Sequence, residues 1–229
     1  MTNTDSIFNF EKQCYKAKYQ DKFGIEDTKL WNDGEELSIT LRGVKFISQF
    51  LDDFTPIKDI APKKLEQFTF YSHTELCDFE LEAEISMHIK INEQINPCTL
   101  TLILILGKPN PPRGLLKEEV LLKLSYQKES IHSVGTTGWF EGELLDLGTE
   151  LPEDSYLLCC FNCLYSDYHP VGHGLFGGML CFKRHKKEYL AVKTKDDFLD
   201  LDSETYDIVQ ELYICPEFKK RIPGTGYRG

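Results

Sequence analysis

The sequence predicts a mainly all-β fold, an antiparallel β-sandwich or barrel-like sheet with one or two short helices. Two observations support this prediction. Apolar and polar residues alternate without a break over residues 78–91, which is the period of a strand with one buried face. Roughly ten strand-like segments follow one another at short intervals along the chain, whereas helix signals are sparse.

The alternating segment and the aliphatic segment after it predict a long hairpin. Over residues 78–91 the polar positions are largely acidic and include Glu80, Glu82 and Glu84. This pattern favours a solvated acidic face, and an interaction surface for a basic partner is the alternative. Residues 92–97 are turn-like. Residues 100–106 are apolar at nearly every position, which is typical of a central strand that is covered on both faces.

The rest of the chain adds short strands to this hairpin. Strands are expected at 29–31, 36–46, 66–71, 119–126, 138–147, 156–164, 175–184 and 209–214, and helices only at 5–15 and 202–211. The segment 107–114 (GKPNPPRG) is a rigid loop because its three prolines fix φ and remove donors. The strand pattern resumes directly after it, so residues 1–229 are predicted to form a single domain, in preference to a subdivision near 107–114.

Composition and charge exclude several classes of protein. The 229 residues are 41% hydrophobic, which is ample for a packed core. The net charge of −11 argues against a nucleic-acid binder and against docking on anionic lipid, because both need clustered lysine and arginine. The amino-terminal residues lack the pattern of a secretory signal, and the longest aliphatic run is far shorter than a membrane helix. We therefore expect a cytoplasmic protein with reduced cysteines.

The segment 157–182 (LLCCFNCLYSDYHPVGHGLFGGMLCF) is the most distinctive part of the chain. It contains a glycine-dense loop, and folding such a loop into one conformation costs backbone entropy. Polar side chains at the tip of a loop that is already ordered lose little further entropy when they bind a ligand. Asp167, Tyr168, His169 and His173 are the expected binding residues. Asp167, His169 and His173 are also the candidate catalytic residues, as an acid–base set or an open metal site. The competing interpretation is that the histidines only brace the turn.

The same segment contains candidate ligands for zinc. Cys163, His169, His173 and Cys181 supply two thiolates and two imidazoles, although the spacing C-x5-H-x3-H-x7-C is not that of a standard finger or ribbon. We favour two core cysteines and two loop histidines, and we predict no metal and no cofactor. A nucleophilic Cys160 or Cys163 activated by His169 is disfavoured, because burial in an apolar strand raises the pKa of a thiol.

A calcium loop is a further alternative near the carboxyl end. Asp200, Asp202, Glu204 and Glu211 occupy its first, third, fifth and twelfth positions. The glycine that the sixth position needs for its sharp turn is replaced by Thr205. We favour an acidic surface turn instead.

Four motifs along the chain carry a resemblance to a known family. They are DGEEL at 33–37, LRGV at 41–44, SDYHPVGHGLFGG at 166–178 and PGTGYRG at 223–229. Together they resemble an uncharacterised family of bacterial cytosolic proteins over most of the chain. The resemblance implies one full-length unit and brings no activity and no catalytic residues. Small acidic bacterial proteins of this sort are often immunity or accessory proteins in toxin systems.

Two functional hypotheses from different classes follow. The first is a binding protein, of immunity or adaptor type, whose acidic surface engages a protein partner. The second is a metal-dependent or acid–base enzyme built on Asp167, His169 and His173. An enzyme should gather these three side chains in one concave pocket, whereas a binding protein should show an acidic or aromatic patch.

The cysteine pattern generates the first testable prediction. Thiol counting on denatured, unreduced protein should return all eight cysteines as free thiols, because most of them occupy apolar strand positions in a chain without a predicted secretion signal. A reproducible count of six or fewer would contradict the cytoplasmic assignment.

Overall fold

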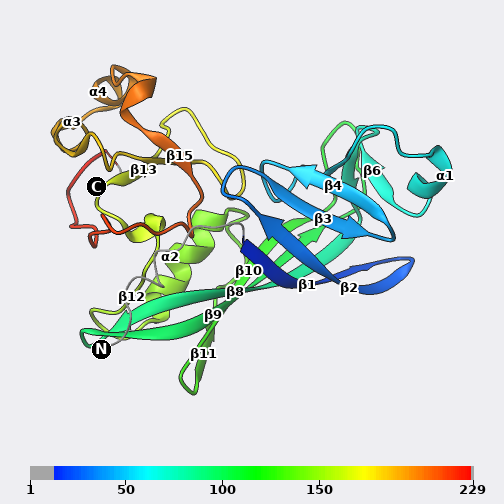
Figure 1. The fold of residues 1–229 in the computed structure, drawn as a ribbon, viewed down its shortest axis with the longest axis horizontal. Coiled ribbons are helices and arrows are strands. Elements are labelled where there is room, and N and C mark those ends of the chain that lie inside the picture. The colour runs from blue at the N-terminus through cyan, green and yellow to red at the C-terminus, as the bar shows by residue number, and fades with distance from the viewer. Residues whose placement is uncertain (1–12, 228–229) are drawn as a thin grey trace.

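The computed structural model describes residues 13–227, and its main element is a ten-stranded antiparallel sheet (Figure 1). Nine strands follow the order β11-β10-β9-β8-β1-β2-β3-β4-β5, and β12 pairs with β8. The predicted mainly β, antiparallel fold is confirmed. The strands are β1 (Gln13–Asp21), β2 (Gly24–Asn32), β3 (Leu37–Leu41), β4 (Val44–Ser48), β5 (Thr55–Pro56), β8 (Phe79–Ile91), β9 (Gln94–Leu106), β10 (Glu118–Tyr126), β11 (Glu129–His132) and β12 (Tyr156–Leu157).

The predicted hairpin is present as β8 and β9, and it is longer than expected. The two strands pair residue by residue from Phe79↔Leu106 to Ile91↔Gln94. The turn is only Asn92 and Glu93, both at positive φ, so the expected turn over 92–97 is wrong beyond its first two residues. Residues 100–106 lie between two partner strands, but only their leucines are buried; the other face is partly exposed and not covered as expected.

The acidic row of β8 is partly neutralised by its neighbour. Glu82 and Glu84 lie directly opposite Lys18 and Lys16 of β1, and Glu80 lies opposite Gln20. Opposite charges on directly opposed strand positions attract one another. The row is therefore part of a mixed-charge face and not a purely acidic surface.

Several expected elements differ from the structure. The expected strands 156–164, 175–184 and 209–214 are strands only at 156–157, 179–181 and 209, and the expected strand 36–46 is divided by a turn at 42–43.

Three further segments have another type of structure or lie partly outside the described residues. Residues 138–147 do not form a strand, because the helix α2 (Phe140–Glu150) buries Phe140, Leu144 and Leu147 at helical spacing. In the expected helix 202–211, the structure has a one-turn 3₁₀ helix, η3 (Ser203–Thr205), and the strand β15 (Asp207–Val209). In the expected helix 5–15, residues 13–15 belong to β1, and the remainder lies outside the described residues.

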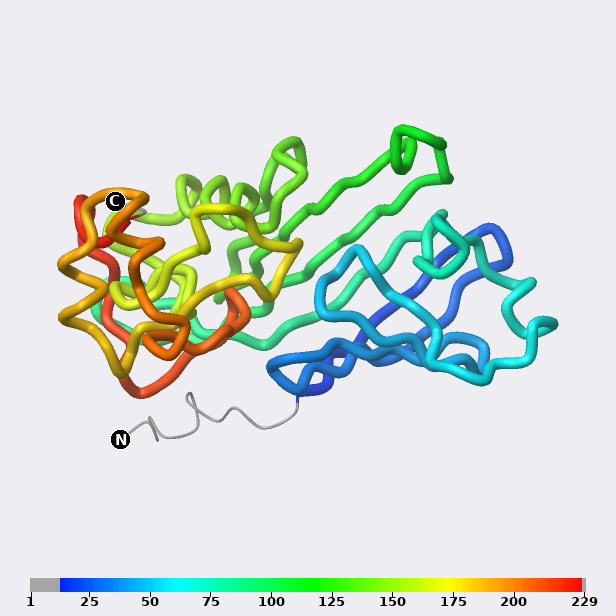
Figure 2. The backbone as a smooth tube through the Cα atoms, turned by 90° about the horizontal axis from the view of Figure 1, so that it is seen from above, coloured from blue at the N-terminus to red at the C-terminus, as the bar shows by residue number. Residues whose placement is uncertain are grey.

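The carboxyl-terminal part forms a second, smaller layer at one end of the large sheet (Figure 2). A three-stranded sheet has the order β13-β14-β15, and its core is continuous with that of the large sheet. Four short helices occur where one or two were expected. The remaining elements are α1 (Pro62–Leu65), β6 (Thr69–Tyr71), β7 (Glu75–Cys77), η2 (Cys160–Asn162), β13 (Ser166–Tyr168), β14 (Met179–Cys181), α3 (Lys186–Ala191) and α4 (Lys195–Leu199).

The loop 107–114 connects β9 and β10, which are paired neighbours in the large sheet. The chain thus continues in the same sheet on both sides of this loop. A single domain over residues 1–229 stays a prediction. Within residues 13–227, no helix combines the length and apolar character needed to cross a membrane.

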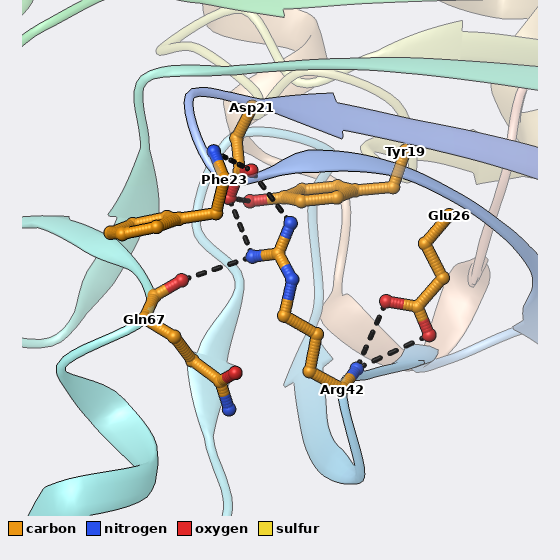
Figure 3. A network of polar contacts seen from close by, with 6 residues as sticks. All are labelled: Tyr19, Asp21, Phe23, Glu26, Arg42 and Gln67. Carbon is orange, nitrogen blue, oxygen red and sulfur yellow. Dashed lines mark hydrogen bonds and ion pairs between the residues drawn. The ribbon is translucent and has the colours of Figure 1, made fainter.

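Arg42 fastens the far end of the large sheet (Figure 3). Its guanidinium donates to both carboxylate oxygens of Asp21, at 2.7 and 2.6 Å, and to the carbonyl oxygen of Gln67 at 3.0 Å. Burial opposes ionisation of Asp21, but the hydrogen bonds from Arg42 and from the Phe23 N–H hold the pKa of this carboxyl below its usual value. A single side chain in the β3–β4 turn thereby ties together the β1–β2 turn and the segment before β6.

The hairpin register generates the second testable prediction. Leu81→Ala should lower the free energy of unfolding by about 2–4 kcal/mol, because Leu81 is 1% exposed and its truncation leaves a cavity. Glu82→Gln, one residue away on the opposite face, should change it by less than about 0.5 kcal/mol. Urea denaturation measures both values. Equal losses at the two positions would mean that the assignment of faces is wrong.

Candidate functional site

Asp167 lies in the protein interior and not at the crown of the glycine-rich loop. Its side chain is on β13, 1% exposed, and its carboxylate accepts hydrogen bonds from the Tyr189 hydroxyl at 2.8 Å and from the Tyr168 N–H at 2.9 Å. The guanidinium of Arg221 donates to the same Tyr189 oxygen at 3.4 Å and to the Ser166 carbonyl. Asp167 thus helps to hold α3 and the carboxyl-terminal segment against β13.

The PGTGYRG motif packs onto this buried cluster. A Cβ atom at Gly226, whose φ is +69°, would lie 2.1 Å from the Tyr189 hydroxyl oxygen. The Thr225 carbonyl accepts a hydrogen bond from Arg221 at 3.3 Å. The glycine is therefore needed both for its backbone conformation and for the close approach of Tyr189.

The two histidines of the loop have separate environments. The His169 imidazole accepts a hydrogen bond from the Val171 N–H through Nδ1 at 3.3 Å, and its ring meets Phe198 edge-on. The His173 ring stacks on Tyr168 with centroids 4.0 Å apart. Its Nδ1 is 3.0 Å from the Gly174 carbonyl oxygen, and its Nε2 is 3.1 Å from a carboxylate oxygen of Glu141. Both neighbouring groups are acceptors. The imidazole can therefore donate a hydrogen bond to each of them at the same time only when both ring nitrogens carry a proton.

A buried glutamate outside the predicted set joins this cluster. Glu211 is 1% exposed, and its carboxylate accepts hydrogen bonds from the Tyr168 hydroxyl at 3.2 Å and from the Gly177 N–H at 2.7 Å. Burial raises its pKa to about 7, although these two hydrogen bonds and the charge of His173 act in the opposite direction. Glu211 is in the interior while Asp200, Asp202 and Glu204 are exposed, and no three of these carboxylates are grouped to hold a metal ion within residues 13–227.

The cysteines near the loop belong to the core. All eight cysteines lie in the described part of the chain and are free, and Cys160, Cys163 and Cys181 are each at most 3% exposed. Burial raises the pKa of the Cys163 thiol, and a hydrogen bond with Cys160 together with burial raises that of Cys181 to about 11. In residues 13–227 no three histidine, cysteine, aspartate or glutamate side chains are grouped to hold a metal ion, so the candidate zinc ligands Cys163, His169, His173 and Cys181 are not assembled.

A cleft of about 530 Å³ lies at the surface between residues of the large sheet's turns and residues of the small sheet. One wall comes from the β2–β3 turn and from the segment after β4, and the opposite wall comes from β15 and its flanks, with one glycine of the loop between them. The lining residues are Gly34, Glu35, Gln49, Phe50, Gly177, Tyr206, Asp207, Ile208 and Gln210.

The glycine-rich loop contacts the first wall of this cleft. A Cβ at Gly174 would lie 2.2 Å from the Phe50 ring, and the Leu51 N–H donates to the Leu175 carbonyl at 2.9 Å. Gly177 has a φ of +113°, and a Cβ there would lie 3.1 Å from the Gln49 carbonyl oxygen and 3.8 Å from the Gln210 side chain. Glycine at 177 therefore permits both the positive φ and the close approach of its backbone to the Gln49 carbonyl.

Gln210 is one of the residues that line the cleft. It is 3% exposed, and its Oε1 accepts a hydrogen bond from the Asn32 amide, which also donates to the Tyr15 hydroxyl at 3.2 Å. Its Nε2 is buried and has no hydrogen-bond partner within residues 13–227. A buried amide that lacks a partner costs free energy, and turning the amide over would leave its oxygen unpaired instead.

The lining residues were not among the sequence-predicted site residues. A signal was present at Gln210 and Glu211, because these two polar residues interrupt the apolar run 209–214, where a strand was expected. Adjacent polar residues in such a run must be buried, and buried polar groups need partners. The other lining residues lie far apart in the sequence and carry no comparable signal.

Comparison with known proteins places the chain in one family. Residues 13–166 match the model of the Family of unknown function (DUF6304). The chain belongs to this family. No curated protein and no solved structure matches the chain. The DUF6304 match includes the large sheet and the first wall of the cleft, whereas β15, Gln210 and Glu211 lie beyond it.

The buried glutamate generates the third testable prediction. The pKa of Glu211 in the fold is about 7 and that of an unfolded glutamate about 4.3, so the fold favours the protonated carboxyl and loses stability as the pH rises through this interval. Glu211→Gln should remove this pH-dependent loss. The difference in unfolding free energy between the variant and the wild type should therefore shift by roughly 3 kcal/mol in favour of the variant from pH 4 to pH 8. Unfolding free energies across this range measure the effect.

A matched variant controls for charge. Glu204→Gln removes the same negative charge from an exposed position and should follow the wild type at every pH. If the Glu211→Gln and wild-type curves stay parallel, Glu211 does not titrate in this interval.

Proposed function

We propose that this DUF6304 protein acts by binding a segment of a partner protein in the cleft between its two sheets. The version that we favour is an immunity-type or adaptor protein whose partner carries basic side chains. The single observation that carries the proposal is the buried Gln210 amide, which lines the cleft and has one polar atom without a hydrogen-bond partner among residues 13–227. A ligand that supplies the missing hydrogen bond would remove this cost.

The walls of the cleft also suit a protein segment. Ile208 is 68% exposed, and half-buried Phe50 and Tyr206 lie along the same space. Apolar and aromatic side chains around a few polar groups are typical of recognition sites. These residues supply contact area, and the Gln210 amide supplies orientation.

Charge favours a basic partner. The chain has a net charge of −11, and the exposed Glu35 at the rim makes no ion pair with any residue in the described range 13–227. The acidic row of β8, by contrast, lies beside lysines of β1. Glu35 at the cleft is therefore a better binding site for a lysine or arginine of the partner than the acidic row of β8.

The enzyme alternative has less support from the geometry. Asp167 contacts Tyr189, His169 faces Phe198, and His173 contacts Glu141. An acid–base or metal-dependent reaction needs side chains that converge on one substrate position. These three residues instead have different partners.

A comparison of two isoleucines provides the fourth prediction. A displayed library of random twelve-residue peptides is selected on the wild-type protein, and the selected peptides are then measured by fluorescence polarisation. Ile208→Asp should lower the affinity for these peptides by about tenfold or more, because it places a charge in the apolar wall of the cleft. Ile25→Asp, also at an exposed strand position (60%) but outside the lining of the cleft, should leave the affinity unchanged.

Thermal melts of both variants show whether each remains folded. An equal loss of affinity in the two variants would contradict the cleft as the binding site. So would selected peptides that bind the wild type and Ile208→Asp with the same affinity.

A further inference from the structure

The small sheet ends in an open edge at the cleft. Strand β15 pairs with β14 on one side, through Met179↔Val209, Leu180↔Ile208 and Cys181↔Asp207. On its other side it has no partner strand among the described residues. An edge strand presents a row of backbone N–H and C=O groups that another strand can pair with.

The cleft runs along this edge. Tyr206, Asp207, Ile208 and Gln210 line it, so the cleft extends along β15 and its flanks, while Val209 of the strand lies outside its lining. Three strand residues extend over roughly 10 Å. The β2–β3 turn and the segment after β4 line the same cleft, and no described strand occupies the free side of β15.

One residue beside this edge carries hydrogen-bonding groups that suit a peptide backbone. The amide of Gln210, one residue beyond the strand, has an unpartnered polar atom, and a side-chain amide has the same donor and acceptor types as a peptide group. The hydrogen-bonding groups of a peptide backbone thus match both the edge of β15 and the Gln210 amide beside it.

The rim and the strand indicate which side chains accompany that backbone. Ile208 offers an apolar surface that is 68% exposed. Across the cleft, the carboxylate of Glu35 has no ion-pair partner within residues 13–227. Side chains of a strand alternate between two faces, so an apolar residue and a basic residue on the same segment can reach these two places.

We infer that the partner contributes an extended segment with apolar and basic residues, which adds to β15 as a fourth strand of the small sheet. This inference rests on the proposed function and specifies the occupant of the same cleft. Main-chain hydrogen bonds to β15 supply affinity, and contacts with Ile208 and Glu35 select the side chains. No chemical step is involved.

The test uses the full chain and a twelve-residue peptide from the library selection. A set of peptides is made in which one backbone nitrogen at a time is methylated, which removes one donor without changing the side chain. Affinity should fall about tenfold at every second position in the bound stretch and remain nearly unchanged at the positions between, because an added strand donates only alternate N–H groups to its neighbour.

Hydrogen exchange provides an independent readout. In the free protein, β15 amides that point away from β14 should exchange quickly, and the peptide should slow the exchange of at least one amide among residues 207–209. The amides of β11, the edge strand of the large sheet, should not change. Protection at β11 with none at β15 would overturn the inference.

The outcomes separate the two proposals. Peptides that lose affinity with Ile208→Asp but tolerate methylation at every position would refute strand addition and leave the cleft as the binding site. Selected peptides whose affinity changes neither with Ile208→Asp nor with methylation would overturn the cleft as the binding site and strand addition alike. Glu35→Gln should weaken the binding of peptides that carry basic residues. If it has no effect on peptides whose basic residues have been replaced, those basic residues are the side chains that Glu35 selects.

Discussion

The pairing of β8 with β9 is the constraint on which the rest of the structure depends. The two strands match residue by residue over their whole length, and they hold β1 on one side, β10 on the other and β12 near the turn. A slip of one residue would turn every buried leucine of β9 towards solvent. The hairpin therefore sets both where the core lies and where the small sheet can dock.

The hairpin was predictable because its signal is local. Period-two alternation over 78–91 is read directly from neighbouring residues, and the strand follows from it. The error at 138–147 shows the opposite case. Phe140, Leu144 and Leu147 share a helical face, and buried Glu143 accepts hydrogen bonds from the Gly135 and Thr137 N–H groups before the helix. Those partners are not visible in the apolar pattern of a short segment.

The candidate site was less predictable because its contacts are distant in sequence. The loop residue Asp167 was expected to be presented to solvent, yet its environment is decided by Tyr189 and Arg221 from later elements. The cleft joins the β2–β3 turn to the flanks of β15, and no local pattern connects these segments. Only the polar pair Gln210 and Glu211, inside an apolar run, carried a signal that a sequence can show.

The cleft has a mixed origin within the chain. Gly34, Glu35, Gln49 and Phe50 lie inside the region that matches the family, whereas the wall formed by β15 lies after residue 166. In the arrangement that we propose, recognition is then combinatorial. A relative that retained the large sheet but carried a different carboxyl-terminal portion would present the same first wall with a new edge, and it would discriminate among partners while the hairpin scaffold stayed as it is.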